Sequence, residues 1–244
     1  MERRTLNIEH RTSNIEHRTS NLAWGQGIRT LIVGGGASHD YPRWFGQADS
    51  AILSEGGQAS VNYTEDIELV GTALKNVDVL YISNNKSFND PATRKAIFEH
   101  VEAGKGLLLV HPGLWYNWKD WPEFNRVLCG GGALGHDKYG EFEVKLSGIK
   151  HPVTSGVPAS FKITDECYWF QPDPEGTPIE VLATAYSAQK DKSFPAVFVV
   201  KHPKARIVGI TLGHDAKAHE HPAYQTILKN SLKWVAGKRM TNDQ

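Results

Sequence analysis

Residues 106–113 read Gly-Leu-Leu-Leu-Val-His-Pro-Gly, an apolar run that ends in a histidine and a turn. A short apolar run bounded by turn residues is consistent with a strand buried on both faces of a parallel sheet. Two similar runs, 31–33 and 207–212, end shortly before His39 and His214. Because the carboxyl ends of parallel strands line one crevice in which ligands bind, we expect these histidines to lie where they can converge on one ligand.

Strand-like and helical patterns alternate from Gly27 onward, which indicates βαβ units around a parallel sheet. The first half is expected to form strands at 29–34, 58–63, 77–82 and 106–111 and helices at 43–56, 67–75 and 91–103. Short strands then follow one another, which indicates antiparallel strands added at the edge of the sheet: 141–146, 161–170, 179–184, 196–201 and 207–212, before a closing helix over 221–236. Residues 112–140 are too long for an ordinary βα loop, so we expect them to carry binding function, with a short helix near 122–128.

The length of 244 residues and the hydrophobic content of 40% allow one substantial core, so we expect a single α/β domain over 27–237. Ahead of it, the first 24 residues repeat with a seven-residue period that offers one apolar position per repeat. A coiled coil needs two such positions, and so little apolar surface cannot offset chain entropy. We therefore expect a disordered heptapeptide-repeat tail over 1–26, and a short C-terminal tail over 238–244.

The charge balance argues against several classes of partner. The formal net charge is zero, which gives no general attraction to nucleic acid or to an anionic membrane. No apolar stretch has the roughly 18 residues that a membrane span needs. Cys129 and Cys167 lack the spacing of a disulfide framework or a thiolate zinc site, which is compatible with a reducing cytoplasm. We expect a cytoplasmic protein that binds neither nucleic acid nor a membrane.

Glu166 is the carboxylate that we expect to do chemistry. It lies in Thr164-Asp165-Glu166-Cys167-Tyr168-Trp169, where the aromatic neighbours are expected to desolvate it and raise its pKa toward the range of a general acid. Strand alternation places Asp165 on the opposite face. The structural alternative is a strand-end carboxylate that pairs with a lysine or accepts from backbone amides.

Metal binding is a second use of the histidines. His39, His111, His136 and His214, with Glu166 or Asp215, offer ligands that suit Zn²⁺ or a similar divalent ion. Their spacing is scattered, so the sequence leaves convergence open. For His111 the alternative is a core histidine bonded to a backbone carbonyl. His219 and His221 are expected to belong to an exposed loop ahead of the last helix.

Short motifs over nearly all of 28–237 resemble the trehalose-utilisation (ThuA-like) family. They are Gly-Ala-Ser-His-Asp-Tyr (36–41), the run at 104–113, Trp-Pro-Glu-Phe-Asn (121–125), Gly-His-Asp (135–137), His-Pro-Val-Thr-Ser-Gly (151–156), Thr-Asp-Glu-Cys-Tyr (164–168), Thr-Leu-Gly-His-Asp (211–215) and Asn-Ser-Leu-Lys-Trp (230–234). The resemblance implies a flavodoxin-like, class I glutamine amidotransferase-like three-layer sandwich with a mostly parallel central sheet and added antiparallel edge strands. It also implies a role in carbohydrate metabolism. His111 stands where amidotransferases carry their catalytic cysteine, which argues against glutamine hydrolysis, and we interpret Cys167 as a packing substitution.

The loop after His111 is rich in aromatic residues, with Trp115, Tyr116 and Trp118 close together and Asn117 between them. Flat rings with polar edges suit the apolar face and the hydroxyl groups of a sugar ring. The alternative is a loop pinned to the sheet by buried tryptophans.

The leading hypothesis is therefore an enzyme that performs acid/base chemistry on a sugar or keto-sugar derivative, by isomerisation, elimination or hydrolysis. Glu166 and His111 are expected to transfer protons. The expected substrate-binding residues are His39, Tyr41, Trp115, Tyr116, Asn117, Trp118, His136, Tyr168, His214 and Asp215. The alternative is a carbohydrate-binding or sensing module without chemistry, and a third is an unrecognised amidotransferase. The expected partner is a small carbohydrate, and the sequence allows a homo-oligomer.

Overall fold

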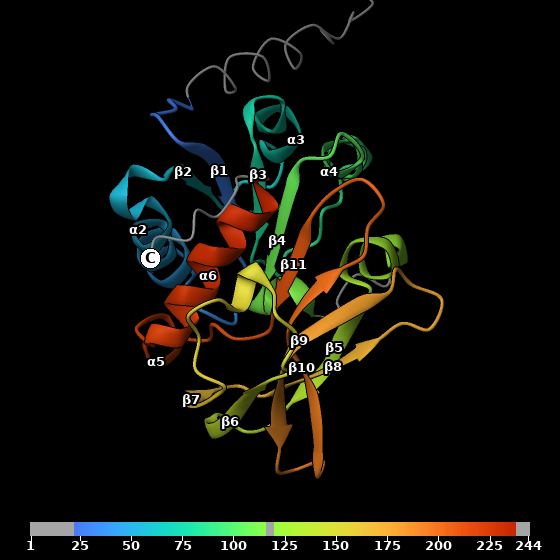
Figure 1. Ribbon diagram of the computed structural model, residues 1–244. Helices are drawn as coiled ribbons and strands as arrows, with labels where there is room; N and C mark the ends of the chain where they lie inside the picture. The colour runs from blue at the N-terminus through green and yellow to red at the C-terminus, as the bar shows by residue number, and fades with distance from the viewer. Residues whose placement is uncertain (1–21, 116–119, 238–244) are drawn as a thin grey trace, which may run out of the picture.

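The computed structural model describes residues 22–115 and 120–237. Most of the predicted N-terminal tail, the C-terminal tail at 238–244, and the predicted site residues Tyr116, Asn117 and Trp118 lie outside the described residues. Within the described part, nine strands form one sheet in the order β2-β1-β3-β4-β11-β10-β9-β6-β7. Figure 1 shows this sheet running through the molecule, with helices packed against it.

The first five strands of that order run parallel. They are β2 (Ala59–Thr64), β1 (Ile28–Val33), β3 (Val79–Ile82), β4 (Gly106–Val110) and β11 (Ile207–Ile210). All of β3, β4 and β11 is buried, as the continuous apolar runs predict. Their carboxyl ends therefore lie at one edge, which is where β4 reaches His111.

The other four strands are antiparallel, as predicted for the added edge. They are β10 (Lys192–Val200), β9 (Ile179–Ser187), β6 (Gly140–Leu146) and β7 (Ser160–Asp165). The prediction of one continuous strand over 161–170 is wrong, because the chain leaves the large sheet after Asp165. It then forms β8 (Tyr168–Pro172), which pairs with β5 (Gly131–His136) in a separate two-stranded sheet. Glu166 lies in the break between β7 and β8.

Helices cover both faces of the sheet, which gives the three layers expected of this fold class (Figure 1). One face packs against α2 (Ser50–Ser54), which continues a π-helical segment over Pro42–Asp49, and against α6 (Pro222–Val235). The other face packs against α3 (Val70–Ala73) and α4 (Pro91–Glu102). A further short helix, α5 (Ala216–His219), and a π-helical segment over Phe124–Cys129 complete these layers. Alternation along β4 explains the division, because Leu107 and Leu109 face one layer while Leu108 and Val110 face the other.

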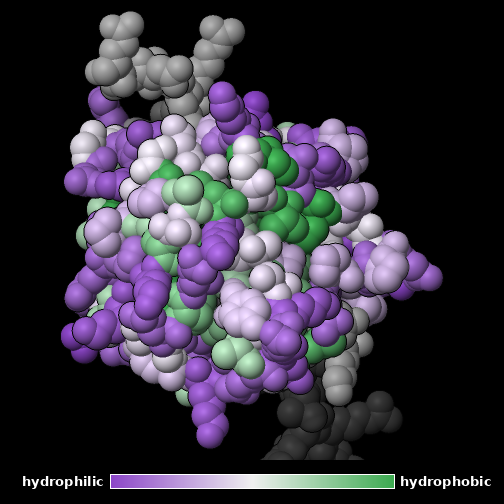
Figure 2. Space-filling view, turned by 60° about the horizontal axis from the view of Figure 1, so that its bottom comes forward, coloured by the Kyte–Doolittle hydropathy of each residue, from purple (hydrophilic) through white to green (hydrophobic). Residues whose placement is uncertain are grey.

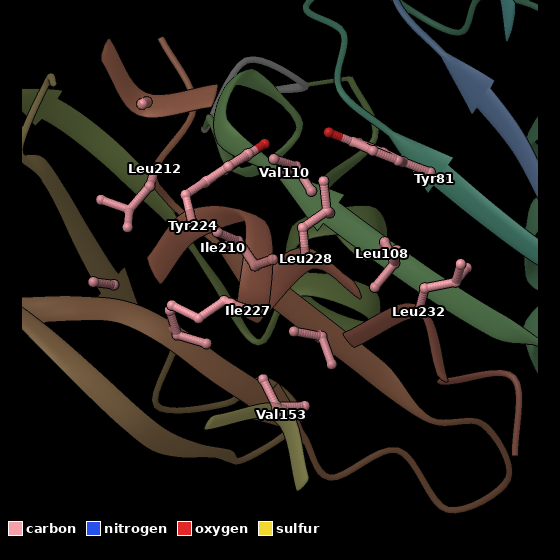
Figure 3. Close-up of a cluster of buried hydrophobic side chains, with 14 of the residues drawn as sticks. Tyr81, Leu108, Val110, Val153, Ile210, Leu212, Tyr224, Ile227, Leu228 and Leu232 are labelled. Atoms are coloured by element: carbon pink, nitrogen blue, oxygen red, sulfur yellow. The ribbon is translucent and has the colours of Figure 1, made fainter. Parts of the chain in front are cut away.

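The α6 side of the core shows why the last helix docks. Ile227, Leu228 and Leu232 recur at helical spacing and are fully buried against the sheet. Figure 3 shows them facing Leu108 and Ile210 of β4 and β11. Burial of a side chain of this size contributes on the order of 1.5–3 kcal/mol, so this stripe alone accounts for much of the docking of α6.

The surface carries mixed polarity. On the face in Figure 2, hydrophilic side chains surround smaller groups of hydrophobic ones. In the described ranges, no helix combines the length and the apolar character that crossing a membrane requires.

Candidate active site

His111 is held at the end of β4 in a strained backbone conformation, with φ at +46°. A positive φ is uncommon for a residue other than glycine and tends to occur at functional sites. Its Nδ1 lies 2.7 Å from the carbonyl oxygen of Thr211. Because a carbonyl only accepts, Nδ1 carries the proton, and in the neutral ring Nε2 has the free lone pair. The side chain of His111 is fully buried. His111 is therefore both the backbone-bonded core histidine and the strand-end histidine of the site, which the sequence offers as alternatives.

Four side chains converge where the strands end. His39, His111, His214 and Glu166 each offer one ligand atom, and these atoms lie within 4.8 Å of one another. Glu166 Oε2 lies 3.5 Å from His111 Nε2 and 3.2 Å from His214 Nδ1. The ring of His39 is centred 4.9 Å from that of His111 and 4.7 Å from that of His214. The geometry predicted from the three strand ends is therefore present.

Glu166 is ionised, and the prediction that its neighbours raise its pKa is wrong. Burial does raise the pKa of Glu166, but the contacts with His111 and His214 outweigh burial and hold it well below its usual range. The aromatic neighbour Tyr168 stacks on His111, at 4.3 Å between ring centres. Glu166 can thus serve as a base or a ligand at neutral pH, but it has no proton to give as a general acid.

The pKa values of His39 and His214 are shifted in opposite directions. Burial, followed by the neighbouring charges of His111 and His214, lowers the pKa of His39 to about 3. For His214, the contact with Glu166 raises the pKa despite partial burial. His39 is therefore neutral at any ordinary pH, with a lone pair on one of its ring nitrogens.

Asp165 positions the loop that carries His214. Its side chain is fully buried and accepts from the backbone amides of Gly213 at 2.7 Å, His214 at 3.2 Å and Glu166 at 2.7 Å. Asp165 thus has the backbone-amide contacts that are the structural alternative for Glu166. One carboxylate of the Asp-Glu pair thus holds the backbone and the other enters the site, although Glu166 follows the end of β7 and strand alternation does not set its direction.

A second buried carboxylate lies behind the site. Asp49 accepts from His219 Nδ1 at 2.7 Å and from the hydroxyls of Tyr81 at 2.5 Å and Tyr224 at 3.0 Å. Figure 3 shows the two hydroxyl groups turned toward one another. His219 Nε2 lies 3.0 Å from the carbonyl oxygen of Gly213. Since both ring nitrogens face acceptors, His219 is protonated, and it ties the Gly213 turn to the core.

The exposed-loop prediction is therefore wrong for His219, which is only 1% exposed. It lies in α5, and its partner Asp49 is 170 residues away in the sequence. No local pattern could have revealed this pair. His221 instead accepts from the amide of Ala223 and caps α6, next to Pro222.

Aromatic and polar side chains lie next to the cluster. Trp115 is half-buried, with its ring 5.7 Å from that of His136 and 5.3 Å from that of Tyr168. His136 ends β5, donates from Nδ1 to the carbonyl of Asp137 at 2.7 Å, and lies 3.7 Å from Glu166 Oε1. It thus contacts Glu166 but lies outside the group of four ligand atoms.

Two other predicted binding residues have structural contacts. Tyr41 is 1% exposed, and its hydroxyl lies 3.0 Å from Ser38 Oγ, beside His39. Asp215 accepts from the amide of Lys217 at the start of α5 and from the hydroxyl of Tyr139. Both residues border the cluster.

The cysteines are poorly suited to nucleophilic chemistry. Burial raises the pKa of the Cys167 thiol to about 12 and that of Cys129 well above its usual range. The thiolate is the reactive form, so neither residue is prepared to act as the nucleophile of an amidotransferase. Cys167 packs in the core on the α6 side, in line with its interpretation as a packing substitution.

Comparisons with known proteins agree with this fold. A family model described as trehalose utilisation (ThuA) matches residues 29–235. A solved ThuA-like protein from Parabacteroides merdae has 23% identity and a TM-score of 0.76, over 89% of this chain and 94% of that chain. Another from Bacteroides uniformis has 23% identity and a TM-score of 0.71, over 87% and 94%.

The chain is also similar in structure to a glutamine amidotransferase from Thermotoga maritima, with 11% identity and a TM-score of 0.53, over 87% of this chain and 99% of that chain. At such identities the structural likenesses show the fold alone, which is the predicted ThuA-like and amidotransferase-like α/β architecture. No curated protein matches the chain.

Proposed function

Since the chain belongs to the trehalose-utilisation (ThuA-like) family, we propose that it is an enzyme that performs acid/base chemistry on a sugar or keto-sugar derivative. The family match supports a carbohydrate-related role. The acid/base reaction and its active residues are proposed from the geometry of the site.

The convergence of Glu166 with the imidazoles is the observation that carries the proposal. Isomerisation, elimination and hydrolysis all require proton acceptors and donors around one reacting carbon or oxygen. An ionised carboxylate lies within 3.7 Å of the rings of His111, His136 and His214. In this proposal Glu166 is ionised and accepts a proton, and His111 lies beside it.

The surroundings of the cluster suit a small carbohydrate. Trp115 offers a flat ring next to the cluster, and the side chain of His136 is 35% exposed. A ring face can stack on the apolar face of a sugar, while imidazole nitrogens bond to hydroxyl groups. We therefore place the substrate between Trp115 and Glu166, in contact with His136.

The test is a turnover screen with the full-length protein. Trehalose, other common disaccharides and their keto derivatives are incubated with the protein, with and without added divalent metal, and the products are followed by chromatography and NMR. Glu166→Gln keeps the shape of the side chain but removes its charge, so we expect turnover to fall at least about a hundredfold. Glu99→Gln is the matched control, because Glu99 lies exposed on α4 and pairs with Lys95.

Each outcome of the screen bears on the proposal. Turnover that is lost in Glu166→Gln and kept in Glu99→Gln supports it. Undiminished turnover in a folded Glu166→Gln variant refutes the role of Glu166. Sugar-dependent tryptophan fluorescence without turnover of any compound would instead favour the carbohydrate-binding module.

A further inference from the structure

We propose that His39, His111, His214 and Glu166 together bind one divalent first-row transition-metal ion, of which Zn²⁺ is the first candidate. The inference deepens the proposed function, and rests on it, by giving the same site a cofactor. Four donor atoms carry the metal proposal, and a metal titration without any sugar tests it.

Unpaired nitrogens are the first observation. In the ranges that the structure describes, Nε2 of His39, Nε2 of His111 and Nδ1 of His214 are buried and have no hydrogen-bond partner. Most buried polar atoms in proteins do have one, so three such nitrogens in a single cluster require an explanation. A cation between them would satisfy all three at once and would also neutralise Glu166.

The arrangement of protons favours a metal over a hydrogen-bond network. His111 donates from Nδ1 to the Thr211 carbonyl, which turns the lone pair of Nε2 toward the carboxylate. Two lone pairs that face one another at 3.5 Å repel unless a cation lies between them. A single proton on one ring would relieve only one of these contacts, because His39 and His214 also face the same point.

Outer contacts also fit a metal site. Metal-binding histidines usually donate their second ring nitrogen to a carbonyl or carboxylate or a similar acceptor, which fixes the ring and its tautomer. His111 does this through Thr211, and His39 Nδ1 lies 2.7 Å from Ser38 Oγ, which in turn accepts from Asn85 Nδ2 at 2.8 Å. When His39 donates to Ser38, its buried Nε2 is free to bind the ion.

The distances suit a small ion. Zn²⁺ binds imidazole nitrogen and carboxylate oxygen at about 2.1 Å, so two ligands of a tetrahedral site lie about 3.4 Å apart. Glu166 Oε2 lies 3.2 Å from His214 Nδ1 and 3.5 Å from His111 Nε2. The whole group fits within 4.8 Å, so one ring needs to move inward by on the order of 1 Å when the ion binds.

The donor set also selects the kind of ion. Imidazole nitrogens suit Zn²⁺, Co²⁺, Ni²⁺ and related ions, whereas Mg²⁺ and Ca²⁺ prefer oxygen ligands. Such an ion would polarise a carbonyl or hydroxyl oxygen of the substrate as a Lewis acid. His136 is not needed as a ligand, and it lies 3.7 Å from Glu166 Oε1, the oxygen that would remain to accept a proton when Oε2 binds the ion.

The test is a binding titration on the full-length chain after chelator treatment. Zn²⁺ is followed by calorimetry, Co²⁺ by its visible absorption, and Mg²⁺ serves as the oxygen-seeking control. We compare His39→Asn, His214→Asn and Glu166→Gln with the control His151→Asn. His151 caps the short helix at Pro152–Thr154, and asparagine can also cap a helix. Circular dichroism confirms that each variant is folded, and Glu166→Gln, which changes neither size nor shape, is the variant least at risk.

We expect one Zn²⁺ or Co²⁺ per wild-type chain and no comparable binding of Mg²⁺. Affinity should fall by more than the 10- to 100-fold typical of outer contacts in the three site variants, and remain at the wild-type value in His151→Asn. Absence of stoichiometric binding, or binding that the site variants leave unchanged, overturns the metal proposal. Sugar turnover by a protein that binds no metal would support the proposed function and refute the metal site. Metal binding without turnover of any sugar would support the metal site and refute the proposed function.

Discussion

Replacing Asp49 with asparagine removes a buried negative charge while keeping the size of the side chain. Asp49 and His219 both have fully buried side chains, and Asp49 accepts from His219 and two tyrosine hydroxyls. Removing one partner of a buried ion pair costs about 3–5 kcal/mol, because the other charge is left unpaired. With no cavity to add to this, we expect Asp49→Asn to lower the free energy of unfolding by that amount, near pH 6.

The loss should depend on pH, and its direction follows from His219. Burial lowers the pKa of His219, but the charge of Asp49, the hydrogen bond to it and the bond to the Gly213 carbonyl outweigh burial, so the pKa is raised. A raised pKa in the folded state adds stability that is fully present below the unfolded value of about 6.5 and is lost as pH rises through the folded value. The cost of Asp49→Asn should therefore shrink between about pH 6 and about pH 9.

Urea unfolding at these two pH values measures both effects. With a slope of about 2–3 kcal/mol per M, the urea midpoint near pH 6 should fall by about 1–2.5 M. Tyr81→Phe is the matched control: it removes one hydrogen bond to the same carboxylate, at a cost of about 1.5–3 kcal/mol, and leaves the pH dependence in place. A cost for Asp49→Asn below about 1 kcal/mol, or one that does not change with pH, would refute the assignment of a charged pair.

Three further changes test separate parts of the structure. Asp165→Asn should weaken Zn²⁺ binding about 10- to 100-fold in a titration, because the loop at Gly213 loses its carboxylate, and unaltered affinity would deny that positioning role. Gly113→Ala should cost about 3 kcal/mol or more, since a Cβ there would lie 2.3 Å from the carbonyl oxygen of Ile82, and a melting temperature within about 2 °C of wild type would contradict the close approach. Asp90→Ala removes the cap of α4 and should cost about 1 kcal/mol of stability, which lowers the melting temperature by about 2–4 °C. In the double variant with Gly113→Ala, the two losses of stability should add.

The parallel half of the fold could be predicted because its signals are local. Continuous apolar runs identify strands such as 106–110, and Asp90 with Pro91 marks the start of α4. This topology predicts that the strand-end histidines share one edge of the sheet, but only the structure shows that their ring nitrogens meet. The family motifs then extended the prediction to the whole α/β architecture.

Other features depend on contacts that no local pattern encodes. The strand β5 is glycine-rich and has little strand propensity, and it forms only because β8 pairs with it. The pKa of Glu166 depends on which rings reach its oxygens, and the sequence shows only that aromatic residues flank it. His219 looked like a loop residue because its partner Asp49 is far away in the chain.

The most direct measurement is an anomalous diffraction map at the zinc absorption edge, from crystals of the full-length protein grown with Zn²⁺. One peak should lie between His39, His111, His214 and Glu166, with bonds of about 2.0–2.2 Å to each. A map without a peak at this position, or with zinc bound only to other histidines, would contradict the claim that these four side chains form one centre.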